Sequence, residues 1–416
     1  MILSGTSPAA VCIAAHVAAV VLLLGRILVL PHHTHHLHIL EHLHTLHVLK
    51  CLKHLSAGVD AAIGAAGGLR RILGCVQQFK FQLVAATCQK HAVAVHFDQL
   101  VAVAEGFAET DVLFIRHLIT GCRGQLGTEL QHQLSAEGCA IGPLPERLRK
   151  ATVIPVDVDE LDITDREATI NYIRRHQPDT VINCAAFTNV DGCETARDAA
   201  FRVNALGPRN LALACEKIGA RLIHVSTDYV FPGTANGGVA LDECAVPAPI
   251  SAYGQTKLLG EQYVERFCRR HFIVRTAWLY SSFGHNFVKT MIKLGRERDK
   301  LGVVFDQIGT PTYARDLARA IMQILAKGVV PGVYHFTDEG VASWYDFTKM
   351  IHKYAGIDSC KVSPLHTSDY PTPATRPHYS VLDKTKIKKT FDIEIPYWAD
   401  SVKECVDILL KQENNQ

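Results

Sequence analysis

Tyr253 and Lys257 stand four residues apart in the stretch SAYGQTK, a spacing that could carry acid–base chemistry. On a helix, residues four apart lie on the same face. An ammonium beside a phenol stabilises the phenolate, so we expect the pKa of Tyr253 to lie below its ordinary value of about 10. Tyr253 is therefore the candidate general acid, and Lys257 is the residue that tunes it and can also hold ribose hydroxyls.

A hydroxyl that could hold a substrate oxygen comes from the stretch HVSTDYVFPG, where Ser226 and Thr227 end an apolar run. In open α/β sheets, ligands lie at the carboxyl ends of the strands. A Tyr-x-x-x-Lys pair alone is common and mostly structural, but joined to a Ser-Thr at a strand end and a glycine loop upstream it is a strong signal of a functional site.

The glycine loop is the stretch GCRGQLG, with Gly121, Gly124 and Gly127. It follows a β-rich run and opens a helix near Gln125. Glycines there let the backbone approach a pyrophosphate, and the helix directs its positive end at the phosphates. The loop predicts dinucleotide binding.

The choice between NAD and NADP stays open at this point. Asp157, Asp159 and Asp162 lie near the end of the second predicted strand, where a carboxylate would hydrogen-bond the adenine ribose. They lie about thirty residues past the glycines instead of about twenty. Arg123, inside the loop, could meet a 2′-phosphate or could be a solvated loop arginine.

The elements that must position these groups alternate along the chain. Predicted strands cover 112–120, 152–158, 180–186, 221–227 and 272–280, and predicted helices lie near 165–176, 195–218 and 251–268. Such alternation predicts an α/β fold, a doubly wound parallel sheet of the Rossmann type with a smaller C-terminal lobe. We expect the Rossmann domain over 111–277, with 301–327 returning to it, and a substrate-binding lobe mainly over 278–411.

With these motifs in place, residues from about 112 to 411 resemble the extended short-chain dehydrogenase/reductases, and within them the dTDP-4-dehydrorhamnose reductase family. The matching stretches include LITGCRGQLG, VINCAAFTNVDGCE, VSTDYVFPGT, SAYGQTKLLGE, DQIGTPTYARDLA and RPHYSVLDKTKI.

The resemblance implies roles for individual residues. It implies a catalytic triad of Thr227, Tyr253 and Lys257. The implied cofactor-binding residues are Gly121, Arg123, Gly124, Gln125, Leu126, Gly127, Asp162, Ile163, Ala185, Ala186, Thr188, Tyr253 and Lys257. The implied substrate-binding residues are Thr227, Asp228, Tyr229, Trp278, Asn286 and Arg376. Arg123 departs from the family, which usually has a small or polar residue there.

The reaction implied is hydride transfer from NADPH or NADH to the C4 keto group of dTDP-4-dehydro-β-L-rhamnose. Tyr253 would deliver the proton, and Thr227 with Tyr253 would hold the developing alkoxide. Two alternatives remain: another nucleotide-sugar epimerase or dehydratase of the same superfamily, and a non-catalytic regulatory subunit on the same fold. A Mg²⁺ ion assists assembly in some relatives, and a homodimer is left open.

The first 110 residues have a different character. Twelve of the 22 histidines lie before residue 100, and leucine recurs at every third position from Leu37 to Leu55. A period of three leaves no single apolar face on a helix or strand, so we expect a low-complexity extension or a mis-assigned reading frame. His38 and His42 could bind a metal, although we predict no fixed metal site, and the run Ala9–Gly25 is just long enough to be a marginal membrane span.

Charge and cysteine content narrow the function classes. Residues 111–416 hold 36 Lys/Arg and 36 Asp/Glu, which argues against a nucleic-acid surface. The 13 cysteines form no C-x-x-C pair, so we expect reduced thiols in a cytoplasmic enzyme.

Overall fold

The computed structural model describes residues 115–135, 146–234 and 237–414, and the statements below concern those residues. The predicted extension at 1–110, with its histidine pair and apolar run, lies outside them. Within the described ranges, no helix is both long and apolar enough to cross a membrane.

A six-stranded parallel sheet forms the centre of the fold, in the order β10-β5-β4-β3-β1-β2. Its strands are β1 (Arg116–Thr120), β2 (Thr152–Val156), β3 (Thr180–Asn183), β4 (Arg221–Thr227), β5 (His271–Thr276) and β10 (Gly332–His335). The chain moves outward from β1 to β2 and then returns to pair β3 on the other side of β1. This reversal is the switch point at which doubly wound sheets bind ligands, and the predicted fold class is confirmed.

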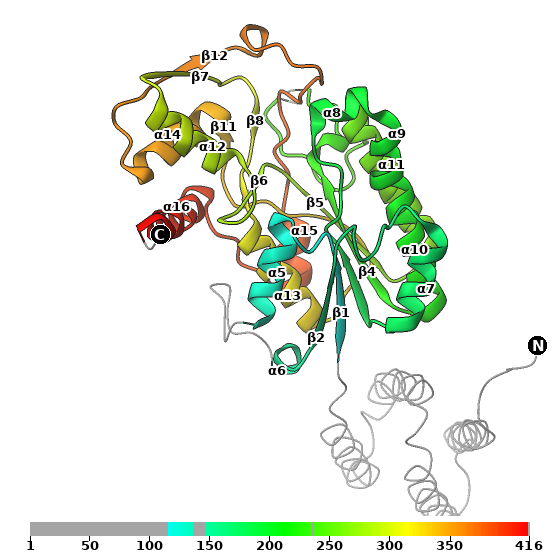
Figure 1. The fold of residues 1–416 in the computed structure, drawn as a ribbon. Coiled ribbons are helices and arrows are strands. Elements are labelled where there is room, and N and C mark those ends of the chain that lie inside the picture. The colour runs from blue at the N-terminus through cyan, green and yellow to red at the C-terminus, as the bar shows by residue number, and fades with distance from the viewer. Residues whose placement is uncertain (1–114, 136–145, 235–236, 415–416) are drawn as a thin grey trace, which may run out of the picture. The chain divides into compact units, whose positions relative to one another are not determined.

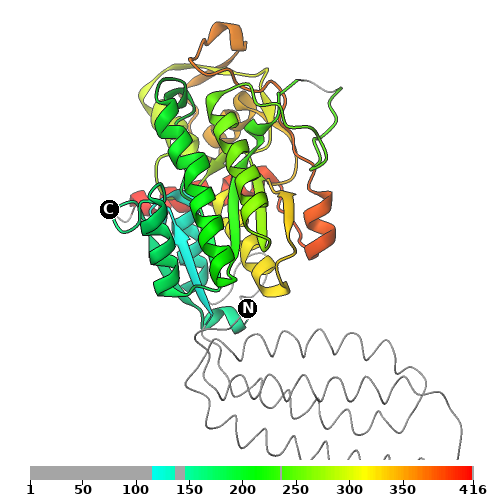
Figure 2. The same ribbon diagram turned by 90° about the vertical axis from the view of Figure 1, so that its right-hand side faces the viewer.

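Helices cover both faces of the sheet (Figure 1). One face packs against α5 (Gln125–Ser135), α6 (Glu146–Arg149), α13 (Ala314–Lys327) and α15 (Thr385–Phe391). The other packs against α7 (Arg166–His176), α10 (Gly207–Ile218) and α11 (Ala252–Phe267), which lie in front of the strands in Figure 2. With both faces covered, the strands can be almost wholly apolar, and all four residues of β3 are buried.

The helix predicted near 195–218 is interrupted. The structure has α8 (Val190–Thr195), α9 (Arg197–Phe201), a π-helical turn (Arg202–Leu206) and then α10. The wide turn carries Asn204, whose side chain accepts from Phe187 N at 2.8 Å and donates to Phe187 O at 3.1 Å. Single π-turns inside helices often mark functional sites, and this one fixes the segment that follows β3.

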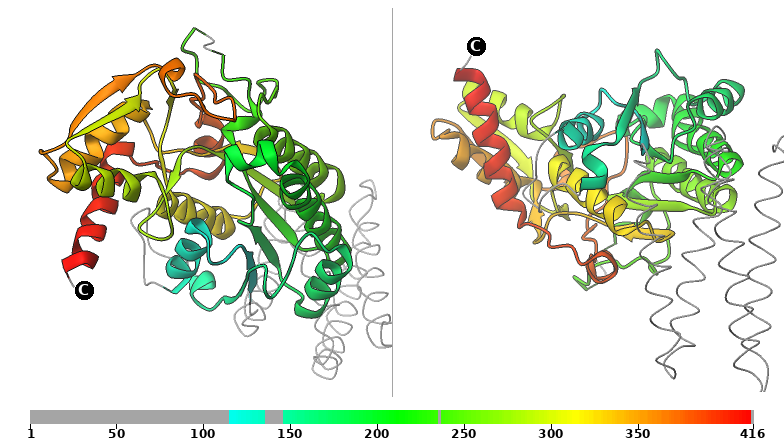
Figure 3. Two further views of the ribbon diagram at one scale, coloured as in Figure 1. Left: turned by 45° about the horizontal axis from the view of Figure 1, so that its top comes forward. Right: turned by 90° about the horizontal axis from the view of Figure 1, so that it is seen from below.

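A second group of elements forms its own apolar cluster. Its helices are α12 (Phe287–Glu297), α14 (Trp344–Ala355) and α16 (Trp398–Asn414). Its short strands pair as β6 (Leu279–Tyr280) with β9 (Thr312–Tyr313), β7 (Lys300–Val304) with β12 (Lys361–Leu365), and β8 (Ile308–Gly309) with β11 (Ala342–Ser343). Figure 3 shows α16 running along this group. The exact division into two domains stays a prediction, since β10 and α15 join the sheet from the segment assigned mainly to the lobe.

Candidate active site

Buried polar side chains link the carboxyl ends of β1 and β3 to each other and to the middle of β4. Thr120 Oγ1 donates to Asn183 Oδ1 at 2.7 Å, and Asn183 Nδ2 lies 3.0 Å from His224 Nδ1. All three residues are almost fully buried. Sequence reasoning missed Asn183 and His224, because their contacts link positions more than 40 residues apart.

The glycine loop follows β1 and is packed too tightly for side chains. Gly121 has φ +65°, and a Cβ there would lie 2.7 Å from Ala185 N. A Cβ on Gly127 would lie 2.3 Å from Gly121 O. The loop leads into α5, whose first residues Gln125 and Leu126 carry N–H groups that the helix itself cannot use. A close backbone and free amides at a helix N-terminus fit an anionic pyrophosphate.

Helix α11 holds Tyr253 in place by its start and its close packing. Ser251 caps the helix by accepting from Gly254 N at 3.2 Å, and Glu194 Oε1 accepts from Ala252 N at 2.7 Å. A Cβ on Gly254 would lie 2.1 Å from Tyr229 O. The helix therefore approaches the segment after β4 more closely than any side-chain-bearing residue would permit.

The side chains of Tyr253 and Thr227 form a hydrogen bond, which the roles predicted for them require. Burial raises the pKa of Tyr253 above its ordinary value, while a hydrogen bond with the Thr227 side chain acts in the opposite direction. Thr227 Oγ1 also donates to Asp228 Oδ1 at 3.0 Å. The Tyr253 ring packs edge-on against Tyr229, with ring centroids 5.5 Å apart.

Lys257 does not act on Tyr253 as the sequence suggested. Its Nζ is buried and donates to Val225 O at 2.7 Å, and burial lowers its pKa to about 8, although Glu261 and Cys184 act to raise it. The prediction that Lys257 lowers the Tyr253 pKa is therefore wrong for this structure, because burial of the phenol dominates. A raised pKa keeps Tyr253 protonated at neutral pH, the state from which a phenol can give up a proton to a substrate.

The residues predicted to line the cofactor lie in two segments, one after β3 and one after β2. Ala185 and Ala186 follow β3 and are partly exposed, and Thr188 is exposed. Ile163 is buried beneath α10, where a Cβ on Gly207 would lie 2.6 Å from its Cδ1. Asp162 is exposed and accepts from Thr164 N at 2.8 Å.

Arg123 is paired with carboxylates. Its Nη2 donates to Glu160 Oε1 at 2.9 Å, its Nη1 donates to Asp159, and its backbone N–H donates to Asp157 Oδ2 at 3.0 Å. Arg123 is therefore an exposed loop arginine that is also ion-paired, and its role toward a 2′-phosphate stays a prediction. Glu160 was missed by sequence reasoning, although it lies among the acidic residues noted there.

Arg376 lies near Tyr229, and Asp191 holds it there. Arg376 donates to both carboxylate oxygens of Asp191, at 3.1 and 2.9 Å, and Ala374 N donates to the same carboxylate at 3.1 Å. The Arg376 charge acts on the pKa of Tyr229, which burial raises. Asp191, in the stretch NVDGCE, was not singled out from the sequence.

Asp228 lies beside Thr227 and is fully buried, and burial raises its pKa to about 6. Hydrogen bonds with Ser380 and Thr227 act to lower that pKa. Ser380 follows the stretch that carries Arg376, so this contact also joins the segment after β4 to the C-terminal part of the chain.

Trp278 and Asn286 have structural contacts of their own. Trp278 adopts φ +48° and stacks on Trp344 with centroids 3.7 Å apart. Asn286 caps α12, since its Oδ1 accepts from Lys289 N at 3.2 Å and its Nδ2 donates to Ser281 O at 2.7 Å. A left-handed conformation is costly for a tryptophan, and such strain often accompanies function. The substrate roles of both residues stay predictions.

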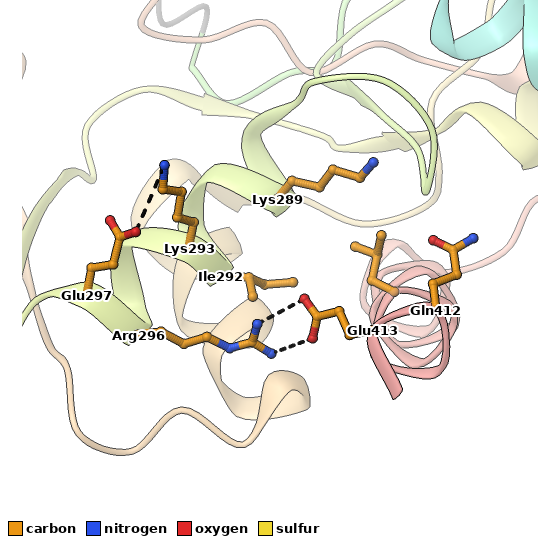
Figure 4. Close-up of a pocket in the computed structure, with 8 residues that line it drawn as sticks. Lys289, Ile292, Lys293, Arg296, Glu297, Gln412 and Glu413 are labelled. Atoms are coloured by element: carbon orange, nitrogen blue, oxygen red, sulfur yellow. Dashed lines mark hydrogen bonds and ion pairs between the residues drawn. The ribbon is translucent and has the colours of Figure 1, made fainter. Parts of the chain in front are cut away.

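A groove between α12 and α16 lies apart from these residues (Figure 4). Arg296 forms two 2.9 Å contacts with Glu413 across it, and Lys293 reaches toward Glu297. It contains none of the predicted site residues. Among the described residues there is no group of three or more metal-binding side chains, and the eight cysteines there are free.

Comparisons with known proteins cover the same part of the chain. The family model described as the RmlD substrate binding domain matches residues 115–411. A dTDP-4-dehydrorhamnose reductase of Aggregatibacter actinomycetemcomitans is 39% identical over 298 residues, which cover 69% of this chain and 97% of the relative.

Two solved structures are similar at the level of the fold as well. A dTDP-4-dehydrorhamnose reductase of Clostridium acetobutylicum has 44% identity and a TM-score of 0.66, covering 71% of this chain and 100% of its own. One from Bacillus anthracis, in complex with NADP, has 38% identity and a TM-score of 0.65, with the same coverage.

Proposed function

The chain belongs to the family of the RmlD substrate binding domain, and from that membership we propose that it reduces the C4 keto group of dTDP-4-dehydro-β-L-rhamnose to give dTDP-β-L-rhamnose. The enzyme is an oxidoreductase that uses a nicotinamide nucleotide. The observation that carries the proposal is the hydrogen bond between Tyr253 and Thr227 at the carboxyl end of β4, the same edge of the parallel sheet at which the glycine loop follows β1.

Each residue of the predicted triad has a separate role in the reaction. Tyr253, a phenol that is protonated at neutral pH, donates its proton to the substrate oxygen. Thr227 offers a hydroxyl to the same oxygen, so that two donors stabilise the negative charge as it develops. Lys257 is held against β4 through Val225 O, which leaves further N–H groups for the ribose hydroxyls.

The nucleotide is held by the glycine loop and the start of α5. Gly121, Gly124 and Gly127 let the backbone come close, and the first amides of α5 face the pyrophosphate. When bound, the reduced nicotinamide supplies the hydride. NADPH and NADH are both candidates, and the NADP bound by the Bacillus anthracis relative supports a nucleotide of this kind.

On the substrate side, we assign Asp228, Tyr229, Trp278, Asn286 and Arg376 to a nucleotide sugar. Arg376 is the strongest of these assignments, because Asp191 holds its guanidinium near Tyr229, whose ring packs against Tyr253. A cytoplasmic location is proposed as well.

A non-catalytic subunit is the weaker alternative, because a chain without chemistry has no need for a half-buried tyrosine hydrogen-bonded to a buried threonine. An epimerase or dehydratase of the superfamily would share the glycine loop and the Tyr-Lys pair. The epimerase and the reductase hypotheses predict different net reactions. An epimerase returns its nucleotide unchanged, whereas a reductase consumes the reduced nucleotide in proportion to substrate.

The test is to mix the purified protein with dTDP-4-dehydrorhamnose and NADH or NADPH, and to follow loss of absorbance by the reduced nicotinamide. We expect one nucleotide oxidised per keto sugar. Tyr253→Phe should keep the fold and nucleotide binding but lower kcat by about 10²–10⁴-fold. Tyr263→Phe, on the same helix but outside the site, is the matched control. Near-normal turnover by Tyr253→Phe would remove the assignment.

A further inference from the structure

Arg123 lies in the glycine loop with its guanidinium held by two carboxylates. Nη2 donates to Glu160 Oε1 at 2.9 Å, and Nη1 donates to Asp159. The Arg123 and Asp159 side chains are 57% and 68% exposed, so the cluster faces solvent. The only cation of the loop therefore has two anionic partners before any ligand arrives.

The acidic residues of this cluster play different structural roles. Asp157 accepts from Arg123 N and Val158 N, and Glu160 Oε2 accepts from Asp157 N at 2.9 Å. Asp157 and Glu160 therefore build the turn after β2. Asp159 has a single described contact, its ion pair with Arg123. Asp159 can be neutralised without removing a hydrogen bond that shapes the turn.

The position of this cluster in the fold suggests its ligand. In doubly wound sheets, a carboxylate at the end of the second strand accepts from the ribose 2′-hydroxyl of NAD, and a nearby arginine accommodates the 2′-phosphate of NADP. This chain has both kinds of group at that position, and they are bound to each other. The glycine loop beside them is shaped for a pyrophosphate, so a dinucleotide would bring its ribose to this end of the sheet.

Resting on the proposed function, we propose that the ion-paired cluster of Arg123, Asp159 and Glu160 selects NADH over NADPH. A phosphate monoester carries a charge of about −1.5 to −2 at neutral pH. To use Arg123, it must displace two carboxylates and then remain beside them. A ribose hydroxyl is neutral and needs no such displacement.

The test is direct binding, measured by isothermal titration calorimetry with NADH and NADPH and with the fragments 5′-AMP and 2′,5′-ADP. We expect wild type to bind NADH about three- to tenfold more tightly than NADPH, in the range of a few exposed charge interactions. Asp159→Asn combined with Glu160→Gln keeps the side-chain shapes and removes two negative charges, and the amide oxygen at position 160 can still accept from Asp157 N. This variant should bind NADPH about five- to tenfold more tightly than wild type, with less than about a twofold change for NADH.

Arg123→Asn, made in wild type and in the neutralised variant, completes a double-mutant cycle. In wild type it should change NADPH affinity little, because the guanidinium is already occupied. In the neutralised variant it should cancel most of the gained NADPH affinity, and this non-additivity reports the coupling. Asp407→Asn combined with Glu216→Gln is the control, since Asp407 and Glu216 form surface ion pairs with Lys403 and Arg269, and the two substitutions together change net charge equally.

The outcomes separate this proposal from the proposed function. If both nucleotides bind wild type equally, or if neutralisation leaves the NADPH-to-NADH ratio unchanged, the selectivity proposal is overturned and the reductase assignment stands. If neither nucleotide binds, both fall. If binding shows the expected selectivity but no keto sugar is reduced, the selectivity stands and the proposed function fails.

Discussion

Lys257 is a charged group placed in a dry part of the fold. Burial lowers its pKa to about 8 from an ordinary value of 10.5. The sign follows directly: the ammonium is present below pH 8 and is lost as the pH rises through that value. A group that must hold ribose hydroxyls as a cation therefore works over a narrower range than an exposed lysine would.

We expect NADH affinity and kcat/KM to fall above about pH 8, as Lys257 gives up its proton. The measurement is a pH profile of both quantities between pH 6 and 10. Lys257→Arg retains a fixed charge, so its profile should lose this break, whatever its absolute activity. A wild-type break near pH 10 would show that Lys257 is not the group responsible.

Arg376 depends on Asp191 for its orientation. Asp191→Asn preserves the shape but removes the charge that draws both guanidinium nitrogens. We expect the KM for the nucleotide sugar to rise roughly three- to tenfold, with kcat and NADH binding nearly unchanged, as for a partly exposed ion pair. Glu216→Gln, which breaks an ion pair with Arg269 elsewhere on the surface, is the control. An unchanged KM would mean that Arg376 needs no anchor or does not touch the substrate.

At this scale the sequence indicates residue types but not their partners. Thr227 and Tyr253 could be paired in advance because each belongs to a recognisable motif. The Asp191–Arg376 pair joins positions 185 residues apart, and no local pattern reports such a distance. The Tyr253 pKa was predicted in the wrong direction, since the sequence contains the charge of Lys257 but not the burial of the phenol.

At the scale of elements, the position of α11 depends on Gly254, which has no side chain. A Cβ on Gly254 would lie 2.1 Å from Tyr229 O and 2.9 Å from Pro249 Cβ, neither of which can move without shifting backbone. The same helix passes Asn204 O at Gly260, where a Cβ would lie 2.2 Å away. Two glycines thus let α11 approach both the segment after β4 and the π-helical turn.

Gly254→Ala should therefore displace the residue next to Tyr253. We expect a loss of about 1–3 kcal/mol in the free energy of unfolding, typical of overpacking, together with a fall in kcat. Thermal denaturation and steady-state kinetics measure the two effects. Gln255→Ala, exposed on the same helix, should change neither appreciably. Normal kcat in Gly254→Ala would show that the close approach does not position Tyr253.

Most strands and helices could be predicted from the spacing of apolar residues and from the turn residues that bound each apolar run. β4 has the limits predicted for it, 221–227, because an apolar run is bounded by clear turn residues. The predicted helix at 195–218 failed at its centre. Gly207 and Pro208, which favour a helix interior poorly, lie just after the π-turn, and Asn204 within it forms hydrogen bonds with Phe187, which lies 17 residues away.

For the whole molecule, the sheet order was within reach of the sequence, since right-handed crossovers between alternating strands and helices leave few arrangements. What the sequence could not show is how the two apolar clusters are joined. Asp316 of α13 accepts from Ser401 Oγ of α16 at 2.6 Å, and Asp338, after β10, accepts from Tyr313 N at 2.9 Å. These buried carboxylates connect the helix on the sheet to the helix of the other cluster.

The two carboxylates make stability depend on pH. Burial and the neighbouring Asp316 charge raise the pKa of Asp338 well above 3.8, and burial also raises that of Asp316. A raised folded-state pKa means that the stabilising contribution is complete below pH 3.8 and is lost as the pH rises through the folded value. At neutral pH, the buried Asp338 Oδ1, for which no partner is described, adds a desolvation cost.

Asp338→Asn should relieve that cost, because an amide keeps an oxygen for Tyr313 N and is neutral at every pH. We expect the variant to be more stable than wild type by about 1–3 kcal/mol at pH 7.5, the range for one unsatisfied buried polar group. The difference should shrink as the pH falls through the raised pKa and the wild-type carboxyl takes up its proton. Thermal denaturation at several pH values measures this, with Asp358→Asn, at an exposed position, as the control. A variant less stable at every pH would mean that Asp338 is needed as a carboxylate, and that the contact between the two clusters relies on its charge.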